Sequence, residues 1–284
     1  MMPHRSTSRV TIDEVDGQKL QRREDVVAVE EPLEIRLIFG SEPGRIEKSI
    51  SITMRTPGND FELAAGFLLS EGIILGADDI HLMTYCVGAE KEKQRYNIVR
   101  VALRPGSKFD PECLARNFYT TSSCGVCGKA SLDALRVQSA YPLIPDRPVI
   151  SGTVVSGLSE KLRKAQPVFE KTGGLHAAAL FDVQGELFAL KEDIGRHNAV
   201  DKLIGEQLMA KKLPLVERIM FVSGRTSFEI MQKAYVAGIP IVAAVGAPSS
   251  LAIDLANEFG MTLIGFVRGE RFNIYAGAQR LHQP

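Results

Sequence analysis

Apolar and polar residues alternate along two short stretches in the first half of the chain. The stretches are residues 33–39 (LEIRLIF) and 46–54 (IEKSISITM), and the turn-forming residues 40–44 (GSEPG) separate them. Alternation with a period of two is typical of a strand, because successive side chains point to opposite sides of the sheet. The pattern therefore predicts a β-hairpin. Residues 1–9, by contrast, are polar and predict a frayed tail.

A helix is predicted directly after this hairpin. Asn59 or Asp60 can serve as its N-cap, apolar residues follow at helical spacing, and Gly72 offers a C-terminal cap. Residues 96–103 predict another strand. Together these elements predict a small α+β roll, which we assign to an N-terminal domain of residues 1–113.

Strands and helices alternate more regularly in the second half. Such alternation indicates a largely parallel sheet with helices on both faces, in three α/β/α layers. We assign this α/β domain to residues 114–284 and a connector loop to residues 118–148. The predicted strands cover 177–181, 186–191, 218–222, 240–245 and 262–267, and the predicted helices cover 156–166 (with Ser156 as cap), 198–209, 227–236 and 249–258.

The composition indicates a globular chain with a sizeable core. The chain has 284 residues, 45% of them hydrophobic, and 34 basic residues balance 34 acidic ones. This neutral balance gives no indication of a nucleic-acid partner. The polar N-terminus does not have the pattern of a secretory signal, and no apolar run is long enough to span a bilayer. We therefore expect a cytoplasmic protein without a membrane partner.

The candidate chemistry centres on Cys124 and Cys127, within residues 122–129 (SSCGVCGK). With four cysteines in the whole chain, a disulfide framework is not indicated. No Asp or Glu lies between Glu112 and Asp133, whereas Lys129 lies beside the pair. A nearby cation lowers the pKa of a thiol from its ordinary value near ~8.5. The pair is therefore a candidate for reactive sulfur chemistry.

Four interpretations of this cysteine pair remain open on the residues alone. Structural zinc needs four ligands, and the chain offers neither a second C-x-x-C nor histidines at ligand spacing, so we predict no metal site. A thioredoxin-like dithiol needs a strand before the pair, where this chain has polar residues. Inert core cysteines would need apolar neighbours. A sulfur carrier needs an exposed thiol of low pKa with a second thiol nearby, and the glycine-rich loop favours this interpretation.

Three loops follow predicted strands and open predicted helices, where free backbone N–H groups can bind an anion. Arg196, His197 and Arg225 add charge or hydrogen-bond donors to them. For the first loop, a capping role in which its charges pair with one another is an equal alternative. As a set, the loops favour a ligand that carries phosphate. They are residues 192–202 (EDIGRHNAVDK), 223–227 (SGRTS) and 246–250 (GAPSS).

The last predicted strand leads into residues 265–273 (GFVRGERFN). Arg268 and Arg271 could hold a phosphate there, and Phe266 could stack on a heterocycle, although an ordinary basic surface turn is the alternative. Another glycine-containing loop ends at His176, a residue that in such a place is more often structural than a ligand.

These motifs together resemble those of the FdhD/NarQ family, the sulfurtransferase accessory proteins of formate dehydrogenase. The resemblance covers about residues 26–275 and is carried by several long motifs in the same order. The matching segments are 55–72, 122–129, 172–181, 192–202, 223–233, 237–251 and 265–273.

The resemblance implies a sulfurtransferase that works through a cysteine persulfide. It implies a cysteine desulfurase as sulfur donor and, as acceptor, the molybdenum cofactor bis(molybdopterin guanine dinucleotide) destined for formate dehydrogenase, with no permanent cofactor. Cys124 is then the persulfide carrier and Cys127 assists it. A non-catalytic chaperone for the cofactor is the alternative, and a homodimer is expected because dimers are common for such folds. The implied cofactor contacts are Phe266, Val267, Arg268, Gly269, Glu270 and Arg271.

The resemblance also implies that the C-terminal domain is cytidine-deaminase-like. Zinc deaminases open one helix with His-x-Glu and the next with Pro-Cys-x-x-Cys. Here His197-Asn198-Ala199 lacks the glutamate, and no cysteine precedes Phe228 in the next loop. We therefore expect a scaffold without the metal, which binds a ligand and does not deaminate it.

Overall fold

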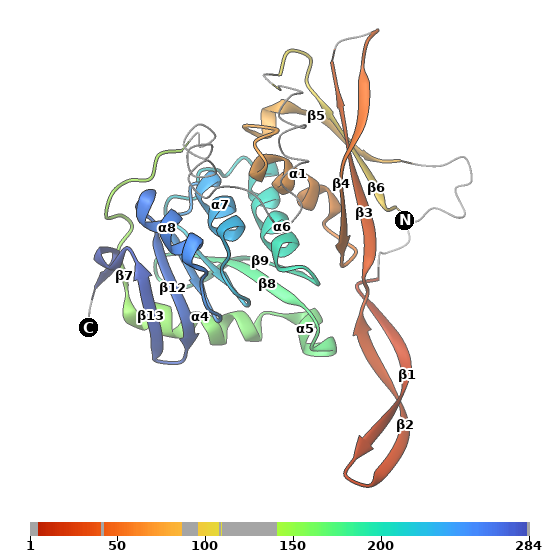
Figure 1. Ribbon diagram of the computed structural model, residues 1–284, viewed down its shortest axis with the longest axis vertical. Coiled ribbons are helices and arrows are strands. Elements are labelled where there is room, and N and C mark those ends of the chain that lie inside the picture. The colour runs from red at the N-terminus through yellow and green to blue at the C-terminus, as the bar shows by residue number, and fades with distance from the viewer. Residues whose placement is uncertain (1–4, 41–42, 87–95, 108, 110–140, 283–284) are drawn as a thin grey trace.

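The computed structural model describes residues 5–40, 43–86, 96–107, 109 and 141–282. Its first half contains a four-stranded sheet in the order β4-β3-β6-β5, and α1 covers one face of this sheet (Figure 1). The predicted hairpin is confirmed, because β3 and β4 pair antiparallel, while β6 lies parallel to β3. The strand β5 was not predicted. The elements are β3 (Glu31–Phe39), β4 (Ile46–Arg55), α1 (Asp60–Ser70), a 3-10 turn (Ala77–Asp79), β5 (Ile80–Tyr85) and β6 (Ile98–Leu103).

The predicted residues flank α1, with Gly72 directly after the C-cap Glu71, but the Asn59 side chain makes no capping hydrogen bond in the described part of the chain. Asn59 is the N-cap, in a left-handed conformation with φ 56°. Gly72 has φ 67°, and its N–H donates to the Leu69 carbonyl at 3.0 Å while the Ile73 N–H donates to Leu68 at 2.9 Å. A glycine at this position ends a helix without steric cost, because it has no Cβ atom.

A long hairpin precedes this sheet and projects away from the body of the molecule (Figure 1). It consists of β1 (Thr7–Asp16) and β2 (Lys19–Ala28), paired in a regular antiparallel register. The prediction of a frayed tail was therefore wrong from Thr7 onward. The hairpin lacks a continuous apolar face, and Val15 and Leu20 beside its turn are 68% and 70% exposed.

The second half is built around a six-stranded sheet in the order β13-β12-β11-β10-β8-β9. Only β10, β11 and β12 are consecutive parallel strands; β8 and β13 run antiparallel to their neighbours. The prediction of a largely parallel sheet is corrected to a mixed sheet, because the β8–β9 and β12–β13 connections are hairpins. The strands are β8 (His176–Phe181), β9 (Leu187–Asp193), β10 (Ile219–Val222), β11 (Ile241–Ala244), β12 (Thr262–Arg268) and β13 (Arg271–Ala276).

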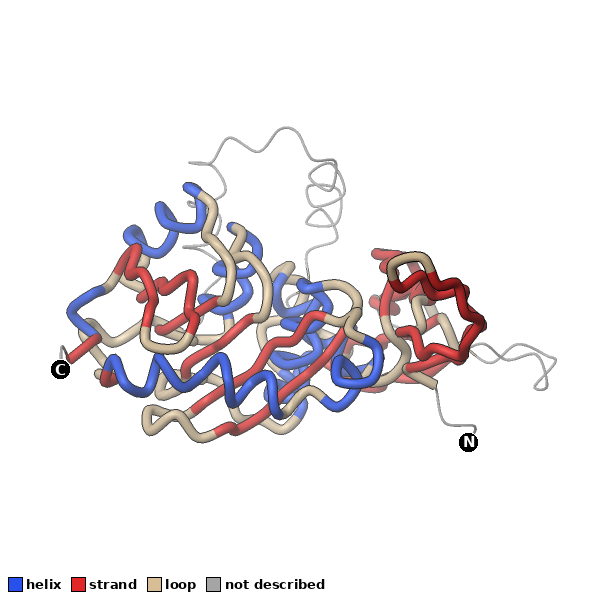
Figure 2. The backbone as a smooth tube through the Cα atoms, turned by 90° about the horizontal axis from the view of Figure 1, so that it is seen from below, coloured by secondary structure: helices blue, strands red, loops and turns tan. Residues whose placement is uncertain are grey.

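Helices cover both faces of this sheet (Figure 2). One face, with Met220 and Val242, packs against α6 to α8 and joins the core of the first half. The other face, with Phe221 and Ile241, packs against α4. Burial of each such side chain contributes roughly 1.5–3 kcal/mol. The helices are α4 (Gly152–Lys164), α5 (Pro167–Thr172), α6 (Arg196–Met209), α7 (Phe228–Val236) and α8 (Ser250–Glu258).

Helix α4 begins four residues before the predicted start. Its N-cap is Ser151, whose side chain accepts a hydrogen bond from the Val154 N–H at 3.2 Å. Ser156, the predicted cap, lies inside the helix, and its hydroxyl donates back to the Gly152 carbonyl at 3.0 Å.

Helices α1 and α6 approach each other unusually closely. A Cβ atom on Gly66 would lie 1.9 Å from the Asp201 carbonyl oxygen, and one on Gly205 would lie 1.8 Å from the Glu62 carbonyl oxygen. Both glycines are therefore needed for the two helix backbones to touch. This contact joins the first half of the chain to the second, while the predicted boundary between residues 113 and 114 lies outside the described residues and stays a prediction.

The end of the described chain returns to the start of the second half. The short strands β7 (Ile150–Ser151) and β14 (Leu281–His282) pair in parallel, next to a 3-10 turn (Ala278–Arg280). The Arg280 side chain is fully buried and donates to the carbonyls of Ile144 (3.0 Å), Arg147 (2.9 Å) and Gly260 (2.6 Å). Within the described part of the chain, every helix is too short or too polar to cross a membrane.

Candidate functional site

The loops singled out in the sequence meet at one edge of the six-stranded sheet. This edge is formed by the carboxyl ends of β9, β10, β11 and β12 and by the start of β8, because β8 runs antiparallel to β10. Ligands of open α/β sheets bind beyond the carboxyl ends of their strands. The three predicted anion loops and the turn after β12 therefore share one surface, as their positions in the sequence predicted.

Backbone hydrogen bonds hold these loops against one another. Thr226 N–H donates to Ala247 at 3.1 Å, and Phe266 N–H donates to Gly246 at 3.1 Å. Gly246 allows the close approach, since a Cβ atom there would lie 2.8 Å from the Gly224 carbonyl oxygen. The edge is thus a preformed platform.

Most charges in the loop 192–202 pair with buried partners of the protein itself. The buried Asp193 carboxylate lies 2.7 Å from the Lys202 ammonium and accepts the Thr56 N–H at 3.2 Å. Lys202 also donates to the Thr56 carbonyl at 2.8 Å. Asp201 pairs with the buried Lys233 at 2.8 Å. For these residues the capping alternative is the better interpretation, and the loop binds the segment that follows β4.

Arg196 and His197 remain at the open side of this loop. His197 Nε2 lies 3.2 Å from the Ser227 hydroxyl oxygen. Burial, together with the nearby Arg196 charge, lowers the pKa of His197 to about 4. The same two causes lower the pKa of His176. Both rings are therefore mainly neutral near pH 7, where each can donate one hydrogen bond and accept another.

Arg196 is the cation of this cluster. Its Nε atom is buried and has no hydrogen-bond partner among the described residues. A Cβ atom on Gly224 would lie 3.4 Å from His176 Nδ1 and 3.7 Å from Arg196 Cδ, so the two side chains flank the same point of the β10 loop. A fixed positive charge near two neutral rings suits an anionic ligand.

The predicted cofactor segment forms the turn between β12 and β13. Phe266 has φ 55° and is 38% exposed, Val267 is fully buried, and Gly269 has φ 55°. Arg268 and Arg271 face each other in the strand register and are both exposed, as is Glu270. The turn thus offers two cations and an aromatic ring at the platform edge.

A cavity of about 600 Å³ adjoins this turn on the α4 side of the sheet. Arg268, His176 and Ser223 line it from the platform, and Arg163 and Gln166 line it from the end of α4. The predictions did not include Arg163 or Gln166. Both lie within the predicted helix 156–166, and the sequence carries no signal that the end of this helix faces the platform.

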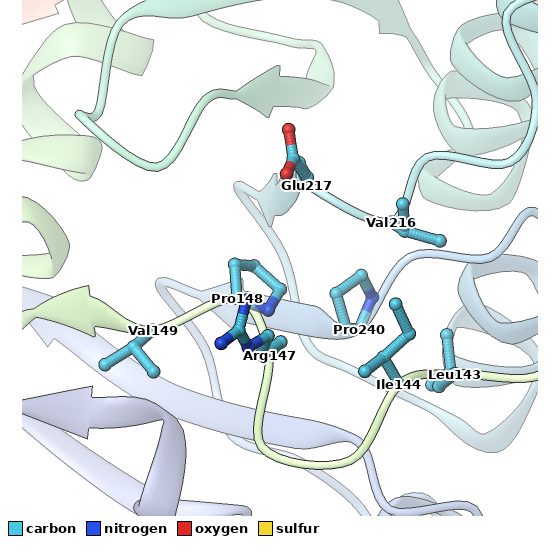
Figure 3. Close-up of a pocket in the computed structure, with 8 residues that line it drawn as sticks. All are labelled: Leu143, Ile144, Arg147, Pro148, Val149, Val216, Glu217 and Pro240. Atoms are coloured by element: carbon cyan, nitrogen blue, oxygen red, sulfur yellow. The ribbon is translucent and has the colours of Figure 1, made fainter.

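A second cavity, of about 430 Å³, lies at the opposite edge of the sheet. Figure 3 shows Ile144, Arg147 and Pro148 on one segment facing Val216 and Glu217. It is mainly apolar and includes none of the predicted site residues. The platform edge is therefore the better candidate for the functional site.

The cysteine pair, Cys124 and Cys127, lies outside the described residues. Its predicted role as the reactive site thus stays a prediction, as does the absence of a metal site there. Within the described residues, no three His, Cys, Asp or Glu side chains are grouped as metal ligands would be.

Comparison with known proteins defines the class to which this fold and platform belong. The model of the FdhD/NarQ family matches residues 28–282. The sulfur carrier protein FdhD of Streptomyces coelicolor is 50% identical over 279 residues, covering 98% of this chain and 96% of the relative. That of Mycobacterium tuberculosis is 46% identical over 280 residues, covering 97% and 99%. The chain belongs to the FdhD/NarQ family.

A solved structure supports the fold. The crystal structure of a candidate formate dehydrogenase accessory protein from Desulfotalea psychrophila superimposes with a TM-score of 0.73 at 23% identity, covering 98% of this chain and all of that one. The similarity extends over both halves of the chain.

Proposed function

We propose that this protein is a sulfurtransferase that carries sulfur from a cysteine desulfurase to the molybdenum cofactor bis(molybdopterin guanine dinucleotide), for use by formate dehydrogenase. The observation that carries this proposal is 50% identity, over almost the whole chain, to a relative named sulfur carrier protein. The cysteine pair in a segment without acidic residues supports it.

The proposed chemistry begins with thiolate exchange. The Cys124 thiolate attacks the terminal sulfur of the desulfurase persulfide; a new S–S bond forms on Cys124, and the desulfurase cysteine leaves as a thiolate. This step needs no oxidant or reductant. The Cys127 thiolate then attacks Cys124 Sγ, so a disulfide forms and the outer sulfur leaves as sulfide for the acceptor. A cellular dithiol reduces the pair again.

The platform edge is the proposed docking surface for the acceptor. Phe266, Arg268 and Arg271 are exposed on the turn after β12, where an aromatic ring and two guanidinium groups suit a guanine nucleotide. Arg196 supplies a further cation on the same edge.

We also propose that the C-terminal half has the cytidine-deaminase-like arrangement. The strand order β9-β8-β10-β11-β12 and the helices between these strands support it. The helix starts that carry zinc ligands in deaminases hold His197 and Ser227 here, and these two side chains lie within hydrogen-bond distance of each other. A histidine and a serine at these positions can offer hydrogen bonds to a ligand, but they do not provide the set of zinc ligands that a deaminase uses.

The central experiment follows the sulfur. We expect the protein to gain the mass of one sulfur atom on Cys124 after incubation with a desulfurase and cysteine, as measured by mass spectrometry of peptides. Cys124→Ala should abolish this gain and also formate dehydrogenase activity in a strain that lacks the native protein. Cys86→Ala is the matched control, because Cys86 directly follows β5 and is far along the sequence from the pair.

The alternative, a chaperone that binds the cofactor without transferring sulfur, gives a different result. Radiolabelled sulfur would then not move from desulfurase to cofactor, although the protein would still co-purify with cofactor. Activity retained by Cys124→Ala would contradict the proposed role of that cysteine.

A further inference from the structure

The hairpin of β1 and β2 has a long strand edge that is open to a further strand. Among the described residues, β2 is the only strand that pairs with β1, and the two form a separate two-stranded sheet. It is β2 that packs against α5, while most of the hairpin projects away from the body (Figure 1). A two-stranded hairpin of this kind is only marginally stable in water, so it gains most from a further strand along its open edge.

The direction of the backbone groups along β1 follows from a hydrogen bond at the base of the hairpin. The Val29 N–H donates to the Ser6 carbonyl at 2.9 Å, so the Ser6 backbone points toward the neighbouring strand. In a regular antiparallel pair this direction alternates from one residue to the next. The N–H and C=O groups of every second residue therefore point outward along the open edge of β1. These residues are Thr7, Arg9, Thr11, Asp13 and Val15.

The side chains along this edge are complementary to those of a second copy of the same strand. When two copies of β1 pair antiparallel across a two-fold axis at Thr11, Arg9 of each copy faces Asp13 of the other. Val10 then faces Ile12 of the second copy, and the two Thr11 side chains face each other. Opposite charges, apolar pairs and threonine pairs at facing positions all stabilise a sheet.

The charges of β1 select this register among those that a two-fold axis allows. Arg9 is the only basic residue of β1, and its acidic residues are Asp13, Glu14 and Asp16. Side chains alternate between the two sides of a strand, so only Asp13 lies on the same side as Arg9. Facing residues of neighbouring strands share one side of the sheet, so Arg9 can face only Asp13, and the axis falls on Thr11.

The ion pairs that these charges form within the hairpin are compatible with a second copy. The Arg9 guanidinium lies 3.6 Å from the Glu24 carboxylate, and the Asp13 carboxylate lies 3.0 Å from the Arg22 guanidinium. All four side chains are exposed, and exposed ion pairs contribute little to stability. In the combined sheet, each charge of β1 keeps its neighbour on β2 and gains another of opposite sign on the second copy.

We propose that the open edge of β1 binds the same edge of a second copy of this chain, so that two hairpins form one four-stranded antiparallel sheet with its two-fold axis at Thr11. A two-fold interface uses the same surface of both copies, which is why such a strand must be complementary to itself. A different partner protein would require no such self-complementarity. The expected homodimer is then joined through this hairpin.

Sedimentation equilibrium of the full-length protein tests the open edge. We expect the wild type to form dimers, and Thr11→Pro to raise the dimer dissociation constant by about tenfold or more, because proline removes an N–H at the centre of the interface from both copies. Glu24→Pro is the matched control. Glu24 faces Thr11 in the hairpin, but its N–H points to the opposite edge, so this variant should leave the dissociation constant unchanged.

Two charge-reversed variants test the register. Arg9→Asp and Asp13→Arg each place like charges opposite each other twice in a dimer, so each variant alone should have a dissociation constant raised by about tenfold or more. A mixture of the two variants restores opposite charges at both contacts, and heterodimers should form with nearly wild-type affinity. Any effect of either substitution within its own hairpin is the same alone and in the mixture.

Three results would overturn the proposal. A wild type that stays monomeric would exclude a second copy as the occupant of the edge. Dimers with the same dissociation constant in the wild type and Thr11→Pro would place the interface on another surface. Failure of the two charge-reversed variants to associate when mixed would refute the register. Sulfur loading of Cys124, which tests the proposed function, is measured separately and depends on none of these results.

Discussion

The close approach of α1 and α6 predicts that one added methyl group lowers the stability of the protein strongly. In Gly205→Ala, the new Cβ atom would lie 1.8 Å from the Glu62 carbonyl oxygen, whereas ordinary contact begins at 3.4 Å. The helices α1 and α6 must then separate by the difference, about 1.6 Å. Neither atom belongs to a flexible side chain, so the strain cannot be relieved by a rotamer change.

The expected magnitude follows from two opposing contributions. Overpacking a core typically costs ~1–3 kcal/mol, and a backbone clash lies at the upper end of that range or beyond it. Replacing a glycine inside a helix by alanine stabilises the helix by about 1 kcal/mol. We therefore expect Gly205→Ala to lower the free energy of unfolding by at least ~2 kcal/mol.

Gly157→Ala is the matched control for this prediction. Gly157 also lies within a helix, α4, but a Cβ atom there would meet nothing within 4 Å. This variant should therefore gain about 0.5–1 kcal/mol from helix propensity. Urea unfolding followed by circular dichroism gives both values. An unfolding free energy of Gly205→Ala equal to or above that of the wild type would refute the close contact.

Three further predictions concern individual polar side chains. Lys202→Met should lower the free energy of unfolding by about 3–5 kcal/mol, because it leaves the buried Asp193 carboxylate without its cation. Urea unfolding measures this loss. A loss below ~1 kcal/mol would contradict a buried ion pair. The neutral His197 ring should stabilise the fold above pH 6.5 and lose this contribution as the pH falls toward 4, since the folded-state pKa of about 4 lies below the ordinary 6.5. Unfolding of wild type and His197→Gln across this range tests it, and parallel pH curves would count against the shift. Ser249→Ala should cost about 1 kcal/mol, because the Ser249 hydroxyl accepts the Ala252 N–H at the start of α8; an unchanged thermal unfolding midpoint would argue against this cap.

The elements that the sequence predicts well are those whose pattern is local. Strand β3 alternates between buried and partly exposed positions, and the two ends of α1 lie at Asn59 and beside Gly72. The hairpin of β1 and β2 was missed because its strands have no continuous buried face. The start of α4 was misplaced because Ser151 and Ser156 can both cap a helix, and the hydrogen bond from the Val154 N–H to the Ser151 side chain decides between them.

Features that depend on distant contacts could not be predicted. Gly66 and Gly205 resemble ordinary helix glycines until α1 and α6 are placed against each other. Likewise, the charges of residues 192–202 suited an anion site equally well, and only the fold shows that Asp193 and Lys202 bind the segment after β4. The mixed direction of the sheet follows from hairpins at β8–β9 and β12–β13, and β13 itself was not predicted, because residues 265–273 were interpreted as a loop after the last strand.

The buried Arg280 side chain has a mechanical consequence. Arg280 lies near the end of the described residues, and its guanidinium binds the segment around Ile144 and Arg147, where the chain enters the second half, and Gly260, in the turn before β12. A force that pulls on either end of this half must therefore break the hydrogen bonds of the Arg280 guanidinium early. Residues 150–282 should therefore resist unfolding from both ends together. Loss of the Arg280 guanidinium would release the first and last segments of this half at the same time.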